Sequence, residues 1–235
     1  MEEKQKEALY YKKVKGNLVQ CQLCPKFCTI KHEERGNCNV RENTGGKLSS
    51  PVYGRLCSMN SDPIEKKPFY HFMPGQQAMS IATLGCNLHC QQCQNWQISQ
   101  TKPEYYPSIP LTPEEVVEKT IEAECNIIAY TYTEPTIFYE YMLDIAKIAK
   151  KQGIKNVIVS NGFINPEPLK ELCRYIDAAN IDLKSITGGF YKKICDGDLK
   201  PILKSIEILH KNKIWTEITN LVIPELNDKE QEIKE

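Results

Sequence analysis

The feature that most constrains the fold is a regular alternation of strand and helix patterns, which runs from about Ala78 to the end of the chain. Short apolar runs predict strands, and the amphipathic runs between them predict helices. The five predicted strands are 79–84, 126–131, 156–160, 178–183 and 214–223. Strands that alternate with helices at this spacing are typical of a parallel sheet with right-handed crossovers. The pattern predicts an α/β fold, and both a barrel and an open doubly wound sheet would produce it.

The helices between these strands have recognisable ends. Thr112 to Glu115 forms a capping box that begins the first helix. The second helix is expected over 136–152, the third after a cap at Asn165, and the fourth over 200–211.

A further cap at 227–228 predicts a fifth helix, yet the sequence stops at Glu235 after about two turns. We therefore expect the chain to be truncated at its C-terminus, without a sixth strand and the segment that follows it.

The N-terminal part of the chain has a different character. Residues 1–16 are charged and are expected to form a helix or a loose arm, and residues 17–75 are rich in Cys, Gly and Pro with little helical period. The expected division is a Cys-rich metal-binding segment over 1–75 and an α/β unit over 76–235.

Three cysteines follow the first predicted strand with the spacing CxxxCxxC: Cys86, Cys90 and Cys93. Iron–sulfur clusters are bound by cysteine thiolates, and a 4Fe–4S cubane normally takes four. Three thiolates would leave one iron free to bind a small molecule. Structural thiols or half of a zinc site are the alternative interpretations.

A second cysteine set lies in the N-terminal part and has the spacing CxxCx3Cx9C: Cys21, Cys24, Cys28 and Cys38. Four thiolates within a short polar segment predict a closed metal site, which could supply folding energy that the small apolar core lacks. Zinc and an auxiliary iron–sulfur cluster both fit, and four unrelated buried thiols are the alternative. The remaining cysteines are expected to be core or incidental residues: Cys57, Cys125, Cys173 and Cys195.

Composition limits the partners and the compartment. Thirty basic residues balance thirty acidic ones, so no net field favours nucleic acid or an anionic membrane. The first residues lack an apolar signal core, and no run approaches membrane-spanning length. Eleven cysteines without a secretory signal indicate metal ligation in a reducing compartment, the cytoplasm.

Several strings resemble the radical S-adenosylmethionine (SAM) superfamily, especially the radical SAM enzyme of the AmmeMemoRadiSam system, which is related to pyruvate formate-lyase activating enzymes. The resemblance runs from about residue 10 to the end of the chain. The strings are CQLCPKFC at 21–28, RGNCNVR at 35–41, DPIEKKPFYHF at 62–72, GCNLHC at 85–90, YTEP at 132–135 and NLVIP at 220–224.

The resemblance implies a partial (β/α)6 barrel with the cluster at the carboxyl ends of the strands, where barrel sites lie. It also implies that SAM binds the open iron of a 4Fe–4S cluster held by the CxxxCxxC cysteines. The expected SAM-binding residues follow strands two, three and four: Thr133, Glu134, Ser160, Asn161, Asp182 and Lys184. The alternatives are that Glu134 only starts a helix, that Ser160 and Asn161 form an ordinary turn, and that Asp182 and Lys184 mark an exposed strand end.

Two motifs depart from the pattern of the superfamily. Its strand-two motif is usually Gly-Gly-Glu-Pro, but Tyr132 and Thr133 replace the two glycines here, so the backbone approaches SAM less freely. The residue before the third cluster cysteine is often aromatic, and here it is Gln92. Trp96 is expected either to stack on the adenine instead or to belong to the core.

The implied activity is that of a radical SAM enzyme of oxidoreductase type, in which an electron from the cluster cleaves SAM and the resulting 5′-deoxyadenosyl radical takes hydrogen from a substrate that the sequence does not identify. An electron donor, flavodoxin or ferredoxin, is implied, and Memo-type and Ammecr-type proteins are expected partners. The alternatives are a glycyl-radical activating enzyme, an iron–sulfur electron carrier and a zinc-binding interaction module.

Overall fold

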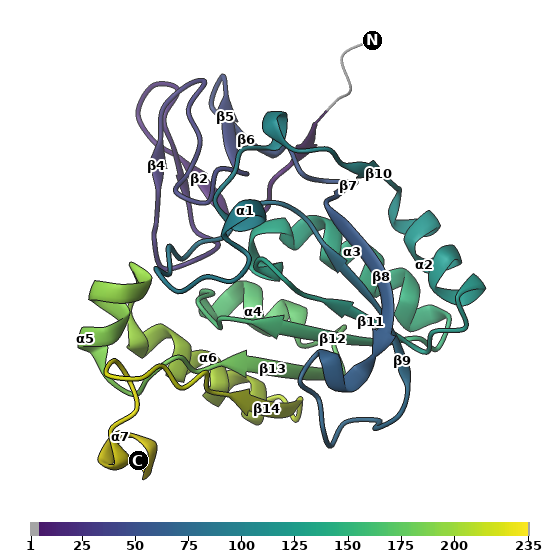
Figure 1. Cartoon of the computed structure of the whole chain (residues 1–235). Coiled ribbons are helices and arrows are strands. Elements are labelled where there is room, and N and C mark those ends of the chain that lie inside the picture. The colour runs from purple at the N-terminus through teal and green to yellow at the C-terminus, as the bar shows by residue number, and fades with distance from the viewer. Residues whose placement is uncertain (1–4, 235) are drawn as a thin grey trace.

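A six-stranded sheet forms the centre of the computed structural model, which describes residues 5–234 (Figure 1). The strand order is β14-β13-β12-β11-β9-β8. Five strands are parallel and confirm the predicted ones: β9 (Gln77–Ala82), β11 (Ile127–Tyr130), β12 (Lys155–Ser160), β13 (Ala178–Asp182) and β14 (Trp215–Thr219). The sixth, β8 (Ser58–Pro63), runs antiparallel to β9 at the edge. The α/β class is therefore confirmed, whereas the partial barrel and the missing last strand stay predictions.

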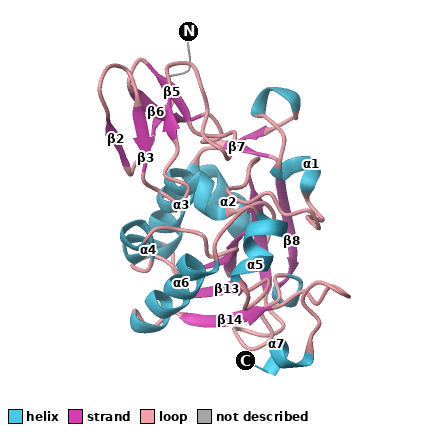
Figure 2. Ribbon diagram, turned by 90° about the vertical axis from the view of Figure 1, so that its left-hand side faces the viewer, coloured by secondary structure: helices cyan, strands magenta, loops and turns pink. Residues whose placement is uncertain are grey.

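One face of the sheet is covered by helices, which Figure 2 shows together on one side of the strands. They are α2 (Pro113–Glu122), α3 (Tyr139–Lys151), α4 (Pro166–Leu172) and α6 (Leu199–Lys211). The predicted capping box at the start of α2 is confirmed, since Thr112 and Glu115 each bind the other's backbone N–H. None of these helices, nor any other in residues 5–234, has the length and apolar character needed to cross a membrane.

The opposite face of the sheet is covered by the segment 64–76, which connects β8 to β9. Ile64 and Phe69 of this segment pack against small and branched side chains of the parallel strands. Successive residues of a strand face opposite sides of the sheet. Because helices cover one side and this segment covers the other, these strands are buried on both faces, as is typical of parallel sheets. On β14, the carboxylate of Glu217 accepts hydrogen bonds from three consecutive backbone N–H groups, at residues 70–72.

The N-terminal residues form two small antiparallel sheets and a short ribbon. One sheet contains β1 (Lys6–Glu7), β6 (Lys47–Ser50) and β5 (Glu42–Thr44), and the other contains β2 (Tyr11–Lys13), β3 (Val19–Cys21) and β4 (Thr29–Ile30). The ribbon pairs β7 (Arg55–Leu56) with β10 (Ile109–Pro110). The expected helix or loose arm over 1–16 is therefore wrong for the described residues of that range; residues 1–4 lie outside them. The division at residue 75 stays a prediction. The segment before that boundary includes β8, which belongs to the central sheet.

A buried ion pair fastens the N-terminal unit to α3. Arg41 donates from Nη2 to both carboxylate oxygens of Glu140, at 2.9 and 2.8 Å. Glu140 also accepts the backbone N–H of Leu9 at 2.7 Å. The structure therefore places a salt bridge inside the joint between the N-terminal unit and the helical layer.

Short helical turns complete the fold. They are η1 (Ile64–Lys66), α1 (Trp96–Ser99), η2 (Pro103–Tyr105), η3 (Pro135–Phe138), α5 (Gly188–Phe190), η4 (Tyr191–Cys195) and α7 (Glu230–Lys234). α1, η3 and the α5–η4 pair stand in the connections after β9, β11 and β13, and therefore surround the carboxyl edge of the sheet.

Candidate active site

Polar side chains meet at the carboxyl edge of the sheet, where β9, β11, β12 and β13 all end. Figure 1 shows β12 and β13 pointing toward the side that carries α5 and the N-terminal strands. The cysteine loop follows β9, and Glu134, Ser160 and Asp182 follow or close the next three strands. Parallel strands place their carboxyl ends together, so residues far apart in the sequence share one site.

Glu134 is the buried centre of this edge, with 0% of its surface exposed. Its carboxylate accepts hydrogen bonds from Ser160 Oγ at 2.7 Å, Asn161 N at 2.8 Å and Thr136 N at 2.9 Å. Burial raises the pKa of this carboxyl, and the three hydrogen bonds oppose that shift. Three predicted site residues are thus in direct contact, and Glu134 positions the other two.

Cys86, the first cysteine of the CxxxCxxC loop, connects to this group through Asn161. Asn161 donates from Nδ2 toward Cys86 Sγ at 3.8 Å, and the N–H of Leu88 donates to the same sulfur at 3.4 Å. Burial and then the nearby Glu134 carboxylate hold the pKa of Cys86 well above its ordinary value, and Cys90 and Cys93 act in the same direction. The three thiols therefore lie close enough to influence one another.

Asp182 and Lys184 form an ion pair at 3.2 Å beside the cysteine loop. Burial alone would lower the pKa of Lys184, but Asp182 and Cys90 raise it further than burial lowers it. The backbone N–H of Lys184 donates to Tyr191 Oη at 2.8 Å. The pair thus closes a strand end, and its ammonium group faces the cluster cysteines.

Cys195 is the site residue that sequence reasoning missed, because it was expected to be core or incidental. It is buried, and its hydrogen bond with Cys90 raises the pKa of the Cys90 thiol. The cluster loop also donates backbone N–H groups to η4, from His89 to Cys195 O and from Gln91 to Ile194 O. No local signal marks Cys195, since only the folded chain brings it to the loop.

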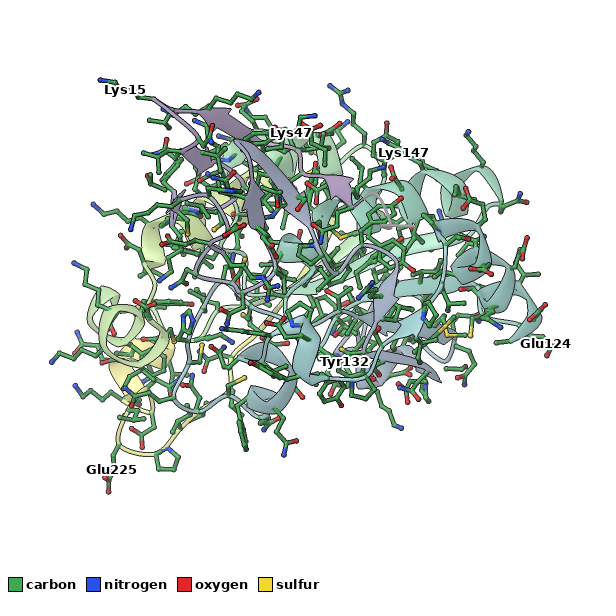
Figure 3. The ribbon with its side chains drawn as sticks, turned by 90° about the horizontal axis from the view of Figure 1, so that it is seen from above. Lys15, Lys47, Glu124, Tyr132, Lys147 and Glu225 are labelled. Atoms are coloured by element: carbon green, nitrogen blue, oxygen red, sulfur yellow. The ribbon has the colours of Figure 1, made fainter. Side chains whose placement is uncertain are left out.

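Tyr132 and Thr133, which replace the two glycines of the strand-two motif, have distinct environments. Tyr132, labelled in Figure 3, has φ +67°, a left-handed conformation rare for a side chain of this size. Its carbonyl accepts from Asn95 Nδ2 at 3.2 Å, and its hydroxyl accepts from buried Lys67 at 2.9 Å. Thr133 Oγ1 donates to Thr83 O at 2.7 Å, so its hydroxyl ties the end of β11 to the end of β9.

Trp96 begins α1 and is 62% exposed. The alternative that it belongs to the core is therefore wrong. Stacking on an adenine ring stays a prediction for this side chain.

The four N-terminal cysteines also come together, around one cavity that Asn87 of the cluster loop lines as well. Burial raises the pKa of Cys24 and of Cys38 to about 12. Both thiols are therefore neutral at physiological pH when no metal is bound.

The donor set of the cluster loop fits an iron–sulfur cluster. Three free thiols lie in this one loop, at Cys86, Cys90 and Cys93, and thiolates are the ligands that such clusters take. Over residues 5–234 no three His, Cys, Asp or Glu side chains already stand in the geometry of a metal site. Binding of a metal here would therefore require the sulfurs to move closer together, as expected where binding and local ordering are coupled.

Comparison with known proteins decides the family. The model of the radical SAM superfamily matches residues 80–235, more than half of the chain. The chain belongs to the radical SAM superfamily. Membership implies an enzyme that uses a 4Fe–4S cluster and SAM, in agreement with the thiols and polar groups at the carboxyl edge.

Individual relatives have different names and cover the chain to different extents. The chain is 48% identical over 223 residues to an uncharacterized protein of Methanocaldococcus jannaschii, covering 95% of this chain and 66% of that protein. It is 25% identical over 162 residues to the pyruvate formate-lyase-activating enzyme of Clostridium pasteurianum, covering 64% and 63%. It is 27% identical over 129 residues to 7-carboxy-7-deazaguanine synthase of Thermococcus kodakarensis, covering 47% and 50%. The chain spans at most about two thirds of the length of these relatives.

Proposed function

We propose that this chain is a radical SAM enzyme whose cluster is held by Cys86, Cys90 and Cys93. The observation that carries the proposal is the meeting of this cysteine loop with Glu134, Ser160 and Asn161 at the carboxyl edge of the sheet. When bound, the cluster would supply one electron that cleaves SAM to methionine and a 5′-deoxyadenosyl radical, which abstracts hydrogen from the substrate. The protein's contribution is to bind, orient and exclude side reactions.

The chain's own groups divide this work. Glu134 is fully engaged by protein donors, so it orders the loops after β11 and β12 and presents Thr133 and Asn161 to the amino-acid end of SAM. Asp182 and Lys184 offer one negative and one positive group to the ribose and carboxylate. Trp96 offers an exposed ring to the adenine.

The experiment is anaerobic reconstitution of the full chain with iron and sulfide, followed by reduction and an assay for 5′-deoxyadenosine. A variant with alanine at Cys86, Cys90 and Cys93 should lose the cluster signal and the product together. Cys173→Ser is the matched control, because this half-buried cysteine lies on α4's end, outside the site, and it should retain both. A cluster-loaded chain that binds no SAM and forms no 5′-deoxyadenosine would contradict the proposal.

A glycyl-radical activating enzyme is the second candidate, supported by the relative named as a pyruvate formate-lyase-activating enzyme. Incubation with SAM, reductant and a candidate glycyl-radical protein separates the two, because only an activating enzyme leaves a persistent glycyl radical on its partner.

The remaining proposals concern partners and setting. We propose flavodoxin or ferredoxin as the electron donor, as is typical of the superfamily. Memo-type and Ammecr-type proteins are proposed partners from the resemblance to the AmmeMemoRadiSam enzyme. The cytoplasm is the proposed compartment, because an oxygen-sensitive cluster needs reducing surroundings.

A further inference from the structure

We propose that Cys21, Cys24, Cys28 and Cys38 bind one zinc ion in a four-thiolate site that buttresses the loop of Cys86. The proposal does not depend on SAM chemistry. It rests on the cavity between these cysteines, on the hydrogen bond to one of their sulfurs and on a buried arginine whose Nε–H lacks a partner.

The cavity collects all four thiols from separate turns of the N-terminal unit. Cys21 ends β3, Cys24 and Cys28 lie in the turn between β3 and β4, and Cys38 follows that hairpin. The cavity has a volume of about 20 Å³, room for about one water molecule. That space is large enough for a single ion.

One of the four sulfurs already accepts a backbone N–H. Cys28 Sγ accepts from Asn37 N at 3.4 Å. Hydrogen bonds of this kind favour the thiolate form that a metal requires.

Arg41 supplies a buried cationic group in which one N–H donor has no hydrogen-bond acceptor. Its side chain is 2% exposed, and it lines the same cavity. Nη1 and Nη2 reach Leu9 O and the Glu140 carboxylate, but Nε has no partner. An unpaired buried N–H is costly and rare. A zinc ion with four thiolates carries a net negative charge, so this Nε–H would have an anionic sulfur to bind.

Zinc is the metal that this donor set favours. It binds four thiolates tetrahedrally and has no redox chemistry of its own, and among common divalent ions it ranks high in affinity for such sites. The thiols do not stand in coordination geometry without metal, so the ion would draw them inward and order the surrounding turns.

The site also touches the cluster loop. Asn87 lines the cavity, accepts from Asn161 Nδ2 at 2.9 Å, and donates to Phe163 O at 2.7 Å. On the same side, an added Cβ at Gly85 would stand 2.6 Å from Cys38 O. Zinc at the N-terminal cysteines would therefore fix the backbone around Cys38 and Val40, which we call the wall, against which the loop of Cys86 packs.

The test uses the full chain with alanine at Cys86, Cys90 and Cys93, so that only the N-terminal set can bind metal tightly. Purified with zinc, it should retain about one zinc per chain, and Cys38→Ser on this background should reduce that to below about a tenth. Cys173→Ser is the matched control and should retain the zinc. Replacement of zinc by cobalt should give the visible spectrum of a tetrahedral thiolate site.

A labelling measurement keeps the test decisive if Cys38→Ser does not fold. In the zinc-loaded triple variant, Cys21, Cys24, Cys28 and Cys38 should resist a maleimide reagent, and a chelator should expose them, as mapped by mass spectrometry. Equal labelling with and without zinc would overturn the proposal. Iron with stoichiometric sulfide at these residues would overturn the zinc assignment. Neither result bears on SAM cleavage, so the two proposals fail separately.

Discussion

Alanine at Gly85 tests how tightly the cluster loop packs against the N-terminal unit. Gly85 has φ +95°, which side chains rarely adopt. An added Cβ would lie 2.6 Å from the backbone oxygen of Cys38 and 2.8 and 2.9 Å from the two Cγ atoms of Val40. The first neighbour is backbone and cannot turn away, so the loop or the wall must move.

The expected cost has two parts. A strained backbone conformation costs about 1–3 kcal/mol, and overpacking of a tight contact costs about 1–3 kcal/mol more. Gly85→Ala should therefore lower the free energy of unfolding by about 2–6 kcal/mol, a large share of the about 5–15 kcal/mol typical of native proteins.

Alanine substitutions at two other glycines distinguish the cost of backbone strain from the cost of overpacking. Gly45 has φ +60° with no atom within 4 Å of the added Cβ, so Gly45→Ala measures strain alone. Gly189 has neither strain nor a close neighbour, so Gly189→Ala should be nearly neutral. Urea unfolding followed by circular dichroism supplies the three values, and iron retention after reconstitution reports on the adjacent Cys86. If Gly85→Ala costs no more than Gly45→Ala, the described packing between loop and wall is wrong.

Three further predictions concern polar groups that are buried or partly buried. Glu134→Gln places an amide N–H₂ against at least one donor such as Asn161 N–H, so urea unfolding should show a loss of about 1–3 kcal/mol; an unchanged midpoint would contradict this. Arg41→Met should cost about 3–5 kcal/mol by leaving Glu140 buried without its partner, and adding Glu140→Leu should recover most of it; a double variant as unstable as the single one would refute the reasoning. Burial, and then Glu171, raises the pKa of Tyr10 from 10.0 to about 12, so this tyrosine contributes stability below pH 10 that is lost as the pH rises toward 12. Unfolding free energies of the parent and Tyr10→Phe should converge over that range.

The sequence was sufficient for the parts of the fold that local patterns encode. The five parallel strands and the cap of α2 follow from apolar runs and from the chemistry of Thr112 and Glu115. β8 was not predicted, because Ser58–Pro63 is polar and contains proline, and only pairing with β9 makes it a strand. The expected helix or loose arm near residues 5–16 was wrong because these residues pair as strands, β1 with the distant β6 and β2 with β3 in a local hairpin.

The candidate site divides in a similar way. Spacing after a predicted strand indicated Cys86, Cys90 and Cys93, whereas Glu134 and Asn161 were indicated by the resemblance to the superfamily, with which the edge rule for parallel strands agrees. Cys195 was not predicted as a site residue, because no sequence pattern around it distinguishes it. It reaches the site only when η4 folds against the cysteine loop. The full engagement of Glu134 by protein donors was likewise invisible, since it depends on atoms from two strands meeting.

The carboxylate of Glu217 has a consequence for the order of folding. It joins the last strand of the sheet to backbone groups at residues 70–72, between 145 and 147 positions earlier in the chain. Contacts of such long sequence separation are slow to form, because the entropy of closing the loop is lost before the contact is gained. We expect the segment 64–76 to pack onto the sheet only after β14 has docked, as the last step of the folding reaction.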